Sequence, residues 1–323
     1  MNDSDEKRFD LERWSGKRIG KIKRTSPVTI VSAIIGRNVI IMAGDSRTTN
    51  EDGTIRDDTK KVFPVRLSDG FGFLLGQSGS DDLGTRAVEL VYQLAKQTPT
   101  KDYRTCAEIA EKSVAKLKDE IRVQFHGTSE ELQKHFERHD FEFLLAHYYK
   151  DDSKDGKLTA PLPYIFTLRF STGIARRHFE KDFVSIGCGS PIADFILDGF
   201  NVREFDFSQN IATAVYALGQ VKKFDPRCGG RTRVATAEKV VWSDGSYMTP
   251  VYELHESFVD EFEKAIKEVI VEFRQHQHKL MTGIMERVNK FISPRIEQMK
   301  KESGGVHIGI DGSINPYTPP KLD

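Results

Sequence analysis

The sequence predicts an α+β protein whose strands pair antiparallel. Apolar, β-branched runs come in pairs that short turns separate, as at 29–35 and 39–43. Between such pairs, apolar residues recur at the 3.6-residue spacing of amphipathic helices, as at 83–94 and 106–121. Because the strands come in hairpin pairs, a parallel βαβ sheet is not expected. The polar segment 122–140 shows neither period, and we expect it to be irregular.

The first hairpin turns at 36–38, where Gly and Asn tolerate positive φ. If the turn has three residues, Thr29 lies opposite Asp45, with their Cβ atoms roughly 5 Å apart. A two-residue turn would place Ile30 opposite Asp45 instead. We expect the three-residue turn.

Composition limits the classes of partner. The chain has 323 residues, enough for one large domain or two, with 38% hydrophobic and 30% charged residues. Its 48 basic and 48 acidic residues balance, which argues against nucleic acid and anionic membranes as partners. Three cysteines without paired spacing indicate a reducing compartment, the cytoplasm. The charged N-terminus is no secretory signal, and no apolar run approaches the ~20 residues of a membrane span.

Two short motifs come at the end of the first hairpin and after it. Asp45-Ser46-Arg47-Thr48-Thr49 ends the hairpin, and the pair Lys60-Lys61 precedes the next strand. Together with the hairpin they resemble the N-terminal core of proteasome β-type subunits and of the related bacterial ATP-dependent peptidase subunit, which are N-terminal-nucleophile (Ntn) hydrolases. The mature chain of that family begins with a threonine, followed by a hairpin, an aspartate and a lysine at this spacing. The resemblance implies that Thr29 is the nucleophile, supported by Asp45 and Lys61.

The start of the motif departs from that family. The family has glycine before its nucleophile and usually a second threonine after it, whereas here Pro27-Val28 precedes Thr29 and Ile30 follows it. An alignment shifted by one residue would place Val28 at the nucleophile position, and such a protein would be inactive.

Three further loops match the family in the same order. The small-residue loop 76–82 resembles the one whose glycine N–H helps to form an oxyanion hole, and Gly79 is the matching position. The alternative is an ordinary turn before a helix, with Ser80 or Asp81 as its N-cap. The other two matches are Gly187-Cys188-Gly189, where the family has Gly-Ser-Gly, and Asp225-Pro226-Arg227-Cys228-Gly229-Gly230, where it has Asp-x-x-Ser-Gly-Gly.

Cys188 and Cys228 therefore stand where the family uses serine. Because a thiol is a weaker hydrogen-bonding group than a hydroxyl, both changes are expected to loosen the network around Thr29. Alternatively, each cysteine is a small buried residue. A metal site formed by the two cysteines and a histidine has little support, because no histidine stands at ligand spacing from either. No metal or cofactor is expected.

The resemblance implies a four-layer αββα sandwich of two antiparallel sheets. We expect a leader or propeptide at 1–28, an Ntn-hydrolase domain at 29–255, a long helical extension at 256–302 and a tail at 303–323. The extension carries an apolar stripe up to Pro294 that either folds back on its own sheet or packs against a neighbouring subunit: Phe258, Phe262, Ile266, Ile270, Phe273, Leu280, Ile284 and Val288.

The implied function is that of a threonine-type endopeptidase in intracellular protein degradation. Its substrates would be polypeptides, and its partners like subunits in an oligomeric ring, with an ATPase unfoldase as a further candidate. The chemistry needs a free α-amine on Thr29, because a hydroxyl is a weak nucleophile until a base takes its proton. Activity is therefore conditional on cleavage before Thr29. Two alternatives remain open, a catalytically inactive structural subunit and an Ntn amidohydrolase of small molecules.

Overall fold

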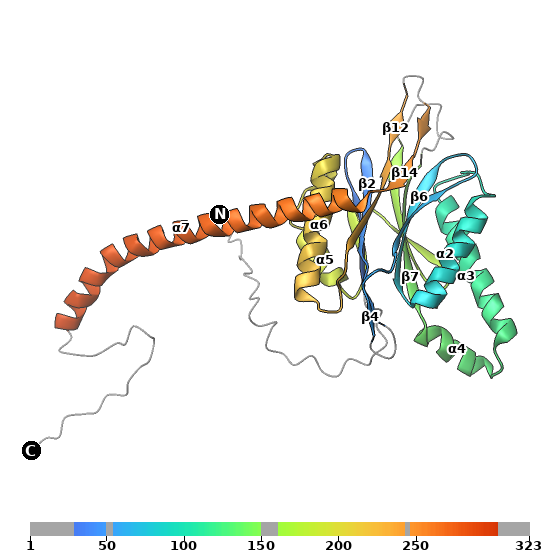
Figure 1. Cartoon of the computed structure of the whole chain (residues 1–323), viewed down its shortest axis with the longest axis horizontal. Coiled ribbons are helices and arrows are strands. Elements are labelled where there is room, and N and C mark those ends of the chain that lie inside the picture. Colours follow the sequence, from blue (N-terminus) through green and yellow to red (C-terminus); the bar gives the residue numbers. More distant parts are fainter. Residues whose placement is uncertain (1–28, 50–53, 150–160, 243–245, 303–323) are drawn as a thin grey trace, which may run out of the picture. The chain divides into compact units, whose positions relative to one another are not determined.

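The computed structural model describes residues 29–49, 54–149, 161–242 and 246–302 (Figure 1). The expected leader at 1–28 and tail at 303–323 lie outside the described residues. The chain divides into two compact units, one up to Glu263 and one from Lys264 onward. No helix in the described ranges has the length and apolarity that crossing a membrane requires.

Two five-stranded sheets form the larger unit, and all strand pairs in them are antiparallel, which confirms the α+β prediction. The first sheet has the order β10-β1-β2-β11-β14, with strands Phe183–Gly187, Ile30–Ile35, Val39–Asp45, Thr232–Glu238 and Val251–Glu253. The second has the order β5-β6-β7-β8-β9, with strands Val62–Arg66, Gly72–Gly79, Phe141–Tyr149, Leu162–Arg169 and Ala175–His178. Two small ribbons pair β3 (Thr48–Thr49) with β4 (Ile55–Arg56) and β12 (Val240–Val241) with β13 (Tyr247–Met248).

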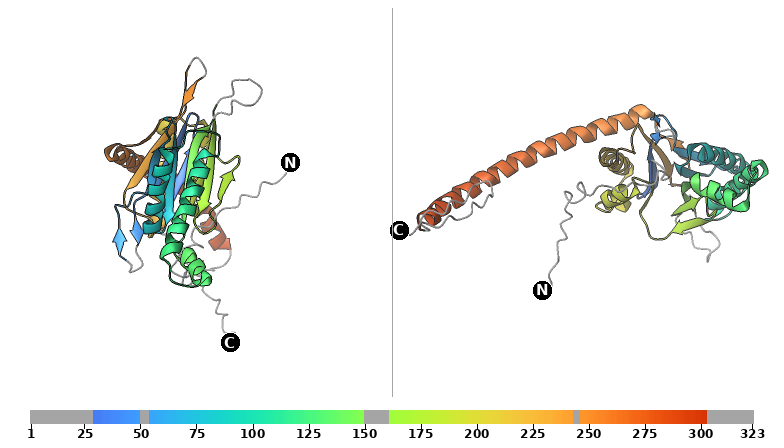
Figure 2. Two further views of the ribbon diagram at one scale, coloured as in Figure 1. Left: turned by 90° about the vertical axis from the view of Figure 1, so that its right-hand side faces the viewer. Right: turned by 90° about the horizontal axis from the view of Figure 1, so that it is seen from below.

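Helices lie on the outward faces of the two sheets (Figures 1 and 2). α2 (Asp81–Ala95) and α3 (Thr105–Gln124) cover the second sheet, whereas α5 (Ser190–Leu197) and α6 (Phe207–Phe224) cover the first. The inward faces meet in one apolar cluster that draws from both sheets, including Val31, Ala33, Met42, Leu74, Leu144 and Ala146. A second cluster joins the second sheet to its helices and includes Leu75, Leu90, Ile109, Val114, Phe143 and Phe166. A short 3-10 helix, Val202–Glu204, precedes α6.

The predicted register of the first hairpin is wrong by one residue. Val31 pairs with Gly44 and Ile35 with Ile40, and the N–H of Gly36 donates to the carbonyl of Val39 at 2.8 Å. The turn therefore has two residues, and Ile30 rather than Thr29 comes opposite Asp45. Every residue of β1 and β2 is buried, so the strands carry no polar face that would reveal the register in sequence.

One helix prediction also needs correction. The segment 122–140 contains α4 (Ser129–Arg138), which begins with a capping box between Thr128 and Glu131. Only Phe136 of α4 is buried, so its apolar signal was too weak to show a period.

The last helix is α7 (Glu256–Glu302), which contains Pro294.

We expect Gly76 to be required for the close approach of the two sheets. A Cβ atom built on this β6 glycine would lie 2.6 Å from Val31 Cγ1 and 3.0 Å from Met42 Sδ, both in the first sheet. Replacement of Gly76 by alanine should therefore lower the free energy of unfolding by roughly 1–3 kcal/mol in a urea titration. Gly219 is the matched control, since it lies in α6 with no atom within 4 Å of a built Cβ. Its replacement by alanine should raise stability by about 1 kcal/mol. Equal midpoints for the two variants would contradict this view of the sheet interface.

Candidate active site

Three strand ends from both sheets bring Thr29, Asp45 and Lys61 together. Thr29 precedes β1, Asp45 is the last residue of β2, and Lys61 precedes β5 of the second sheet. All three are buried, with exposed fractions of 1%, 0% and 5%. The spacing of these residues in sequence therefore corresponds to one compact polar cluster between the sheets.

Hydrogen bonds in this cluster fix the direction of the Thr29 hydroxyl. Its Oγ1 donates to Asp45 Oδ1 at 2.5 Å and accepts a hydrogen bond from Lys61 Nζ. Nζ also donates to Asp45 Oδ1 at 3.0 Å and to the carbonyl oxygen of Arg47. These three acceptors match the three N–H donors of an ammonium group. Lys61 therefore stands as a donor to the hydroxyl oxygen.

Asp45 is saturated with donors from two other segments. The backbone N–H of Ile30 reaches Oδ1 at 3.2 Å, and the N–H of Gly229 reaches Oδ2 at 2.9 Å. The carbonyl of Gly229 in turn accepts from the N–H groups of Ser46 and Arg47, both at 3.2 Å. The loop before β11 is thus tied to the end of β2 by the backbone of a single glycine.

Arg47 is a positioning residue that the sequence did not single out. Its guanidinium pairs with both oxygens of Asp57, at 2.7 and 3.1 Å, and donates to the carbonyl of Pro226 at 3.1 Å. The hydrogen bond to Asp57 raises the pKa of Arg47. A side chain at Gly229 would collide with this guanidinium, which would then have to shift away from Asp57 and Pro226. The only sequence signal was the place of Arg47 inside the DSRTT motif.

The loop 187–189 holds the carbonyl of Thr29. The N–H of Gly189 donates to that oxygen at 3.3 Å, and the Cys188 thiol donates to it at 3.4 Å. Gly187 has φ +94°, and a Cβ built on it would overlap the same carbonyl. The predicted Gly-x-Gly motif therefore lies against Thr29, although it meets the carbonyl side of the residue.

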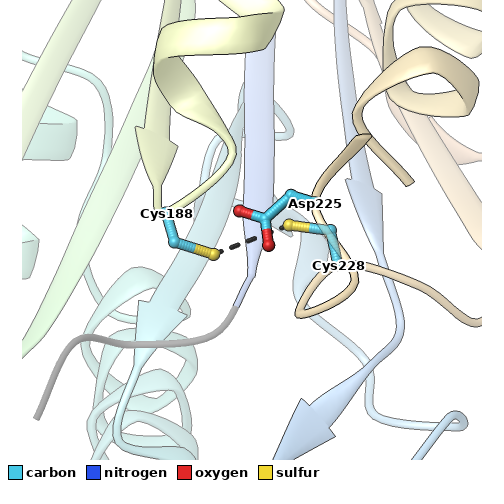
Figure 3. Close-up of side chains that lie close together, drawn as sticks. All are labelled: Cys188, Asp225 and Cys228. Carbon is cyan, nitrogen blue, oxygen red and sulfur yellow. Dashed lines mark hydrogen bonds between the residues drawn. The ribbon is translucent and has the colours of Figure 1, made fainter. Parts of the chain in front are cut away.

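Cys188 and Cys228 lie in direct contact beside this carbonyl (Figure 3). Their sulfur atoms are 3.6 Å apart and share a hydrogen bond. That hydrogen bond, assisted by the nearby Arg227 guanidinium, lowers the pKa of Cys188 against the opposing effect of burial. The same hydrogen bond, together with burial, raises the pKa of Cys228.

Asp225 is engaged by Arg227 rather than by Thr29. Arg227 Nε donates to Oδ1 at 2.9 Å, Nη2 donates to Oδ2 at 2.8 Å, and the Arg227 backbone N–H donates to Oδ1 at 3.0 Å. Burial acts to raise the pKa of Asp225, but these hydrogen bonds outweigh it and the pKa is lowered. Ligand atoms of Cys188, Asp225 and Cys228 lie within 4.8 Å of one another, with no histidine in this group. A metal ion there would have to displace Arg227 from the carboxylate.

Gly79 ends β6 just before α2, at φ +116°. The N–H of the next residue, Ser80, donates to the carbonyl of Asp140, and the Ser80 side chain makes no capping hydrogen bond to α2. None of the hydrogen bonds described for this loop reaches Thr29, so the oxyanion role of Gly79 stays a prediction. Ser78 is a neighbouring residue that the sequence did not single out. Its Oγ is buried without a hydrogen-bond partner and lies 2.9 Å from a Cβ built on Gly187.

The comparisons with known proteins rest on solved structures. No family model matches the chain, and no curated protein matches it in sequence. Among solved structures, the Anbu (Gly-1) mutant from Hyphomicrobium sp. strain MC1 has a TM-score of 0.55 and 14% identity, covering 78% of this chain and 99% of that chain. Anbu (ancestral beta-subunit) from Yersinia bercovieri has a TM-score of 0.54 and 12% identity, covering 76% and 97%. The helical assembly of the Anbu complex from Pseudomonas aeruginosa has a TM-score of 0.55 and 11% identity, covering 77% and 96%.

These findings correct the assignment made from sequence. The motifs resembled proteasome β-type subunits and the bacterial ATP-dependent peptidase subunit, but the structures found are of Anbu, the ancestral beta-subunit, and no family model supports the narrower assignment. Motifs shared widely among chains of this fold cannot separate one branch from another. At 11–14% identity, the likeness shows that this chain has the fold of Anbu.

Proposed function

We propose that this chain is an Ntn hydrolase that cleaves polypeptides with Thr29 as its nucleophile. The observation that carries the proposal is the buried cluster in which Lys61 donates a hydrogen bond to the Thr29 hydroxyl while Asp45 accepts one from it. A lysine and an aspartate buried between two sheets cost stability, and a purely structural core has no need of them. The likeness to Anbu and the packing of helices on two stacked sheets support a four-layer Ntn arrangement.

As long as Thr29 is inside the chain, Asp45 is the group of the cluster that can take the hydroxyl proton. Lys61 has used its donors, and Asp45 already accepts four hydrogen bonds, from Thr29, Ile30, Lys61 and Gly229. A free α-amine on Thr29 would supply the base, because its pKa in model peptides is about 7.7–8.0. Lys61, beside Oγ1, would stabilise the developing alkoxide, and an N–H such as that of Gly79 would meet the oxyanion of the substrate.

Cleavage before Thr29 would use the same hydroxyl, but with Asp45 rather than the α-amine as the proton acceptor. Thr29 Oγ1 would pass its proton to Asp45 Oδ1 and attack the carbonyl carbon of Val28, and the C–N bond between Val28 and Thr29 would break as the nitrogen takes up that proton. Water would then hydrolyse the resulting ester, which restores the hydroxyl and leaves the α-amine free. In the full-length chain Thr29 is only 1% exposed, so a polypeptide substrate has no access to its hydroxyl in this form.

One observation favours the alternative of an inactive structural subunit. The resemblance makes Asp225 an orienting group for the nucleophile, but Asp225 is held by Arg227. In addition, Cys188 and Cys228 stand at the two positions where the family has serine. Under this alternative the buried cluster would serve only to join the sheets. Action on small-molecule amides has no observation in its favour.

The chain is proposed to work as an oligomer of like subunits in the cytoplasm. One of the solved relatives in fold is described as a helical assembly of the Anbu complex, which supports self-association. An ATPase unfoldase as partner stays a prediction. Polypeptides are the proposed substrates, with no cofactor.

Intact-mass measurement on the purified, assembled protein tests the proposal most directly. We expect a species that begins at Thr29, because only this product has the α-amine. Replacement of Thr29 by alanine should leave the chain full-length, and replacement by serine, which retains a hydroxyl, should restore cleavage at least in part. A uniformly full-length wild-type chain in the assembled state would contradict the peptidase proposal.

Replacement of Lys61 by alanine should abolish cleavage and lower peptide hydrolysis by about 100-fold or more, since the alkoxide loses its electrostatic support. The fold should survive, because Asp45 keeps the donors from Thr29, Ile30 and Gly229. The adjacent Lys60 is a matched control, since it pairs with Glu253 at the surface and its replacement should leave hydrolysis unchanged. Circular dichroism and peptide hydrolysis measured together separate the two roles. If Lys61→Ala simply unfolds, the lysine is structural.

The apolar stripe of α7 predicts a role in assembly. Within the second unit, Phe273 of the stripe is 59% exposed, and Val269 and Val271, which lie outside the stripe, are 63% and 53% exposed. The 47-residue helix would span about 70 Å at 1.5 Å per residue. Truncation after Gln275 should therefore shift the particle towards smaller species in light scattering, whereas truncation after Glu302 should not. An unchanged particle size in the first variant would refute the assembly role.

A further inference from the structure

The contact between Cys188 and Cys228 brings two free thiols together from distant parts of the chain. Cys188 lies in the turn between β10 and α5, and Cys228 lies in the loop between α6 and β11 (Figure 3). Their sulfur atoms are 3.6 Å apart. A disulfide bond needs a separation of about 2.05 Å, so the sulfur atoms would approach by about 1.5 Å. Both residues lie outside the strands and helices, where the backbone can take up such a shift.

The two thiols differ in a way that suits stepwise oxidation. Cys188 is half-buried, whereas Cys228 is only 1% exposed. Arg227 lies beside the pair, and its positive charge favours a thiolate on Cys188. Cys188 is therefore the thiol that an oxidant can reach, and Cys228 lies directly behind it as a resolving partner.

We propose that Cys188 and Cys228 form a reversible disulfide with hydrogen peroxide as the oxidant. The Cys188 thiolate attacks one peroxide oxygen and releases hydroxide, which leaves a sulfenic acid. The Cys228 sulfur then attacks the Cys188 sulfur, forms the S–S bond and displaces the hydroxyl group, which leaves as water with the proton from Cys228. In sum, two thiols are oxidised and one peroxide is reduced to two waters.

Oxidation of this pair would act on Thr29. The Cys188 thiol donates to the Thr29 carbonyl, and a disulfide sulfur has no hydrogen to donate. That carbonyl would retain the N–H of Gly189, but the loop that carries it would move as the sulfur atoms approach. A shift of about 1 Å near reacting atoms is enough to slow an enzyme roughly 100-fold. This effect on activity rests on the proposed function, whereas the formation of the disulfide does not.

A metal ion is the competing occupant of the same thiols. Asp225 would be the third ligand, but Arg227 occupies both of its oxygens. Binding of Zn²⁺ would thus compete with a carboxylate–guanidinium pair whose arginine is partly exposed, whereas the disulfide leaves that pair intact. The geometry favours the disulfide.

The test is to treat the full-length, assembled protein with hydrogen peroxide, denature it, alkylate the free thiols and map the unreduced peptides. We expect a crosslink between the peptides of Cys188 and Cys228, and its loss on treatment with dithiothreitol. Cys106 is an internal control, because it is buried and burial raises its pKa. Its thiol should stay reduced with or without peroxide and should be alkylated once the protein is denatured. In Cys188→Ser and Cys228→Ser variants no crosslink should form.

Three results would overturn the proposal. In the first, both cysteines stay reduced after peroxide treatment. In the second, both are oxidised to sulfonic acids and no crosslink forms. In the third, Zn²⁺ protects both thiols from alkylation, and peroxide produces no disulfide. Peptide hydrolysis provides the second measurement. It should fall about tenfold or more on oxidation and recover with dithiothreitol, while the Cys188→Ser variant stays insensitive to peroxide. A crosslink in a protein that hydrolyses nothing in either state would retain the disulfide and refute the proposed peptidase.

Discussion

The buried carboxylate of Asp45, with the donors that converge on it, is the constraint on which the rest of this fold depends. Removing two charges from water costs several kcal/mol for each ion, and the cost is offset only where hydrogen bonds satisfy both groups. Asp45 obtains its donors from the start of β1, the residue before β5 and the loop before β11. These three segments, which come from both sheets, must therefore meet at one point for the chain to fold.

The same network explains why folding and activity are separate problems for this chain. Full satisfaction of Asp45 and Lys61 stabilises the arrangement around Thr29 whether or not the chain is cleaved. Asp45 Oδ1, which accepts the hydrogen bond of the Thr29 hydroxyl, is already shared with Lys61 and the N–H of Ile30. Under the proposed function the cluster would position and polarise Thr29, and the chain's own α-amine would activate it.

The features that could be predicted from the sequence are those that residues close together in the chain determine. The period of apolar residues located most strands and the main helices, because burial repeats along each element. The hairpin register failed because β1 and β2 are buried on both faces, and α4 was missed because a capping box and one buried phenylalanine define it. Thr29, Asp45 and Lys61 could be matched through spacing alone. Arg47 and Ser78 could not, because Pro226 and Gly187, which lie next to them, come from distant parts of the chain. Arg227 pairs with Asp225 only two residues before it, but no periodic pattern marks such a pair.

Cysteine in place of serine changes what the loops around Thr29 can do. A hydroxyl would donate a stronger hydrogen bond to the Thr29 carbonyl, and it could not be oxidised. A thiol at Cys188 donates weakly at 3.4 Å, and it lies 3.6 Å from a second thiol. The hydrogen bond with Cys228 lowers the pKa of Cys188, and Arg227 acts in the same direction, whereas burial and Asp225 act against them. The weaker contact thus makes the position of Thr29 dependent on the oxidation state of its neighbours, a dependence that serine would not permit.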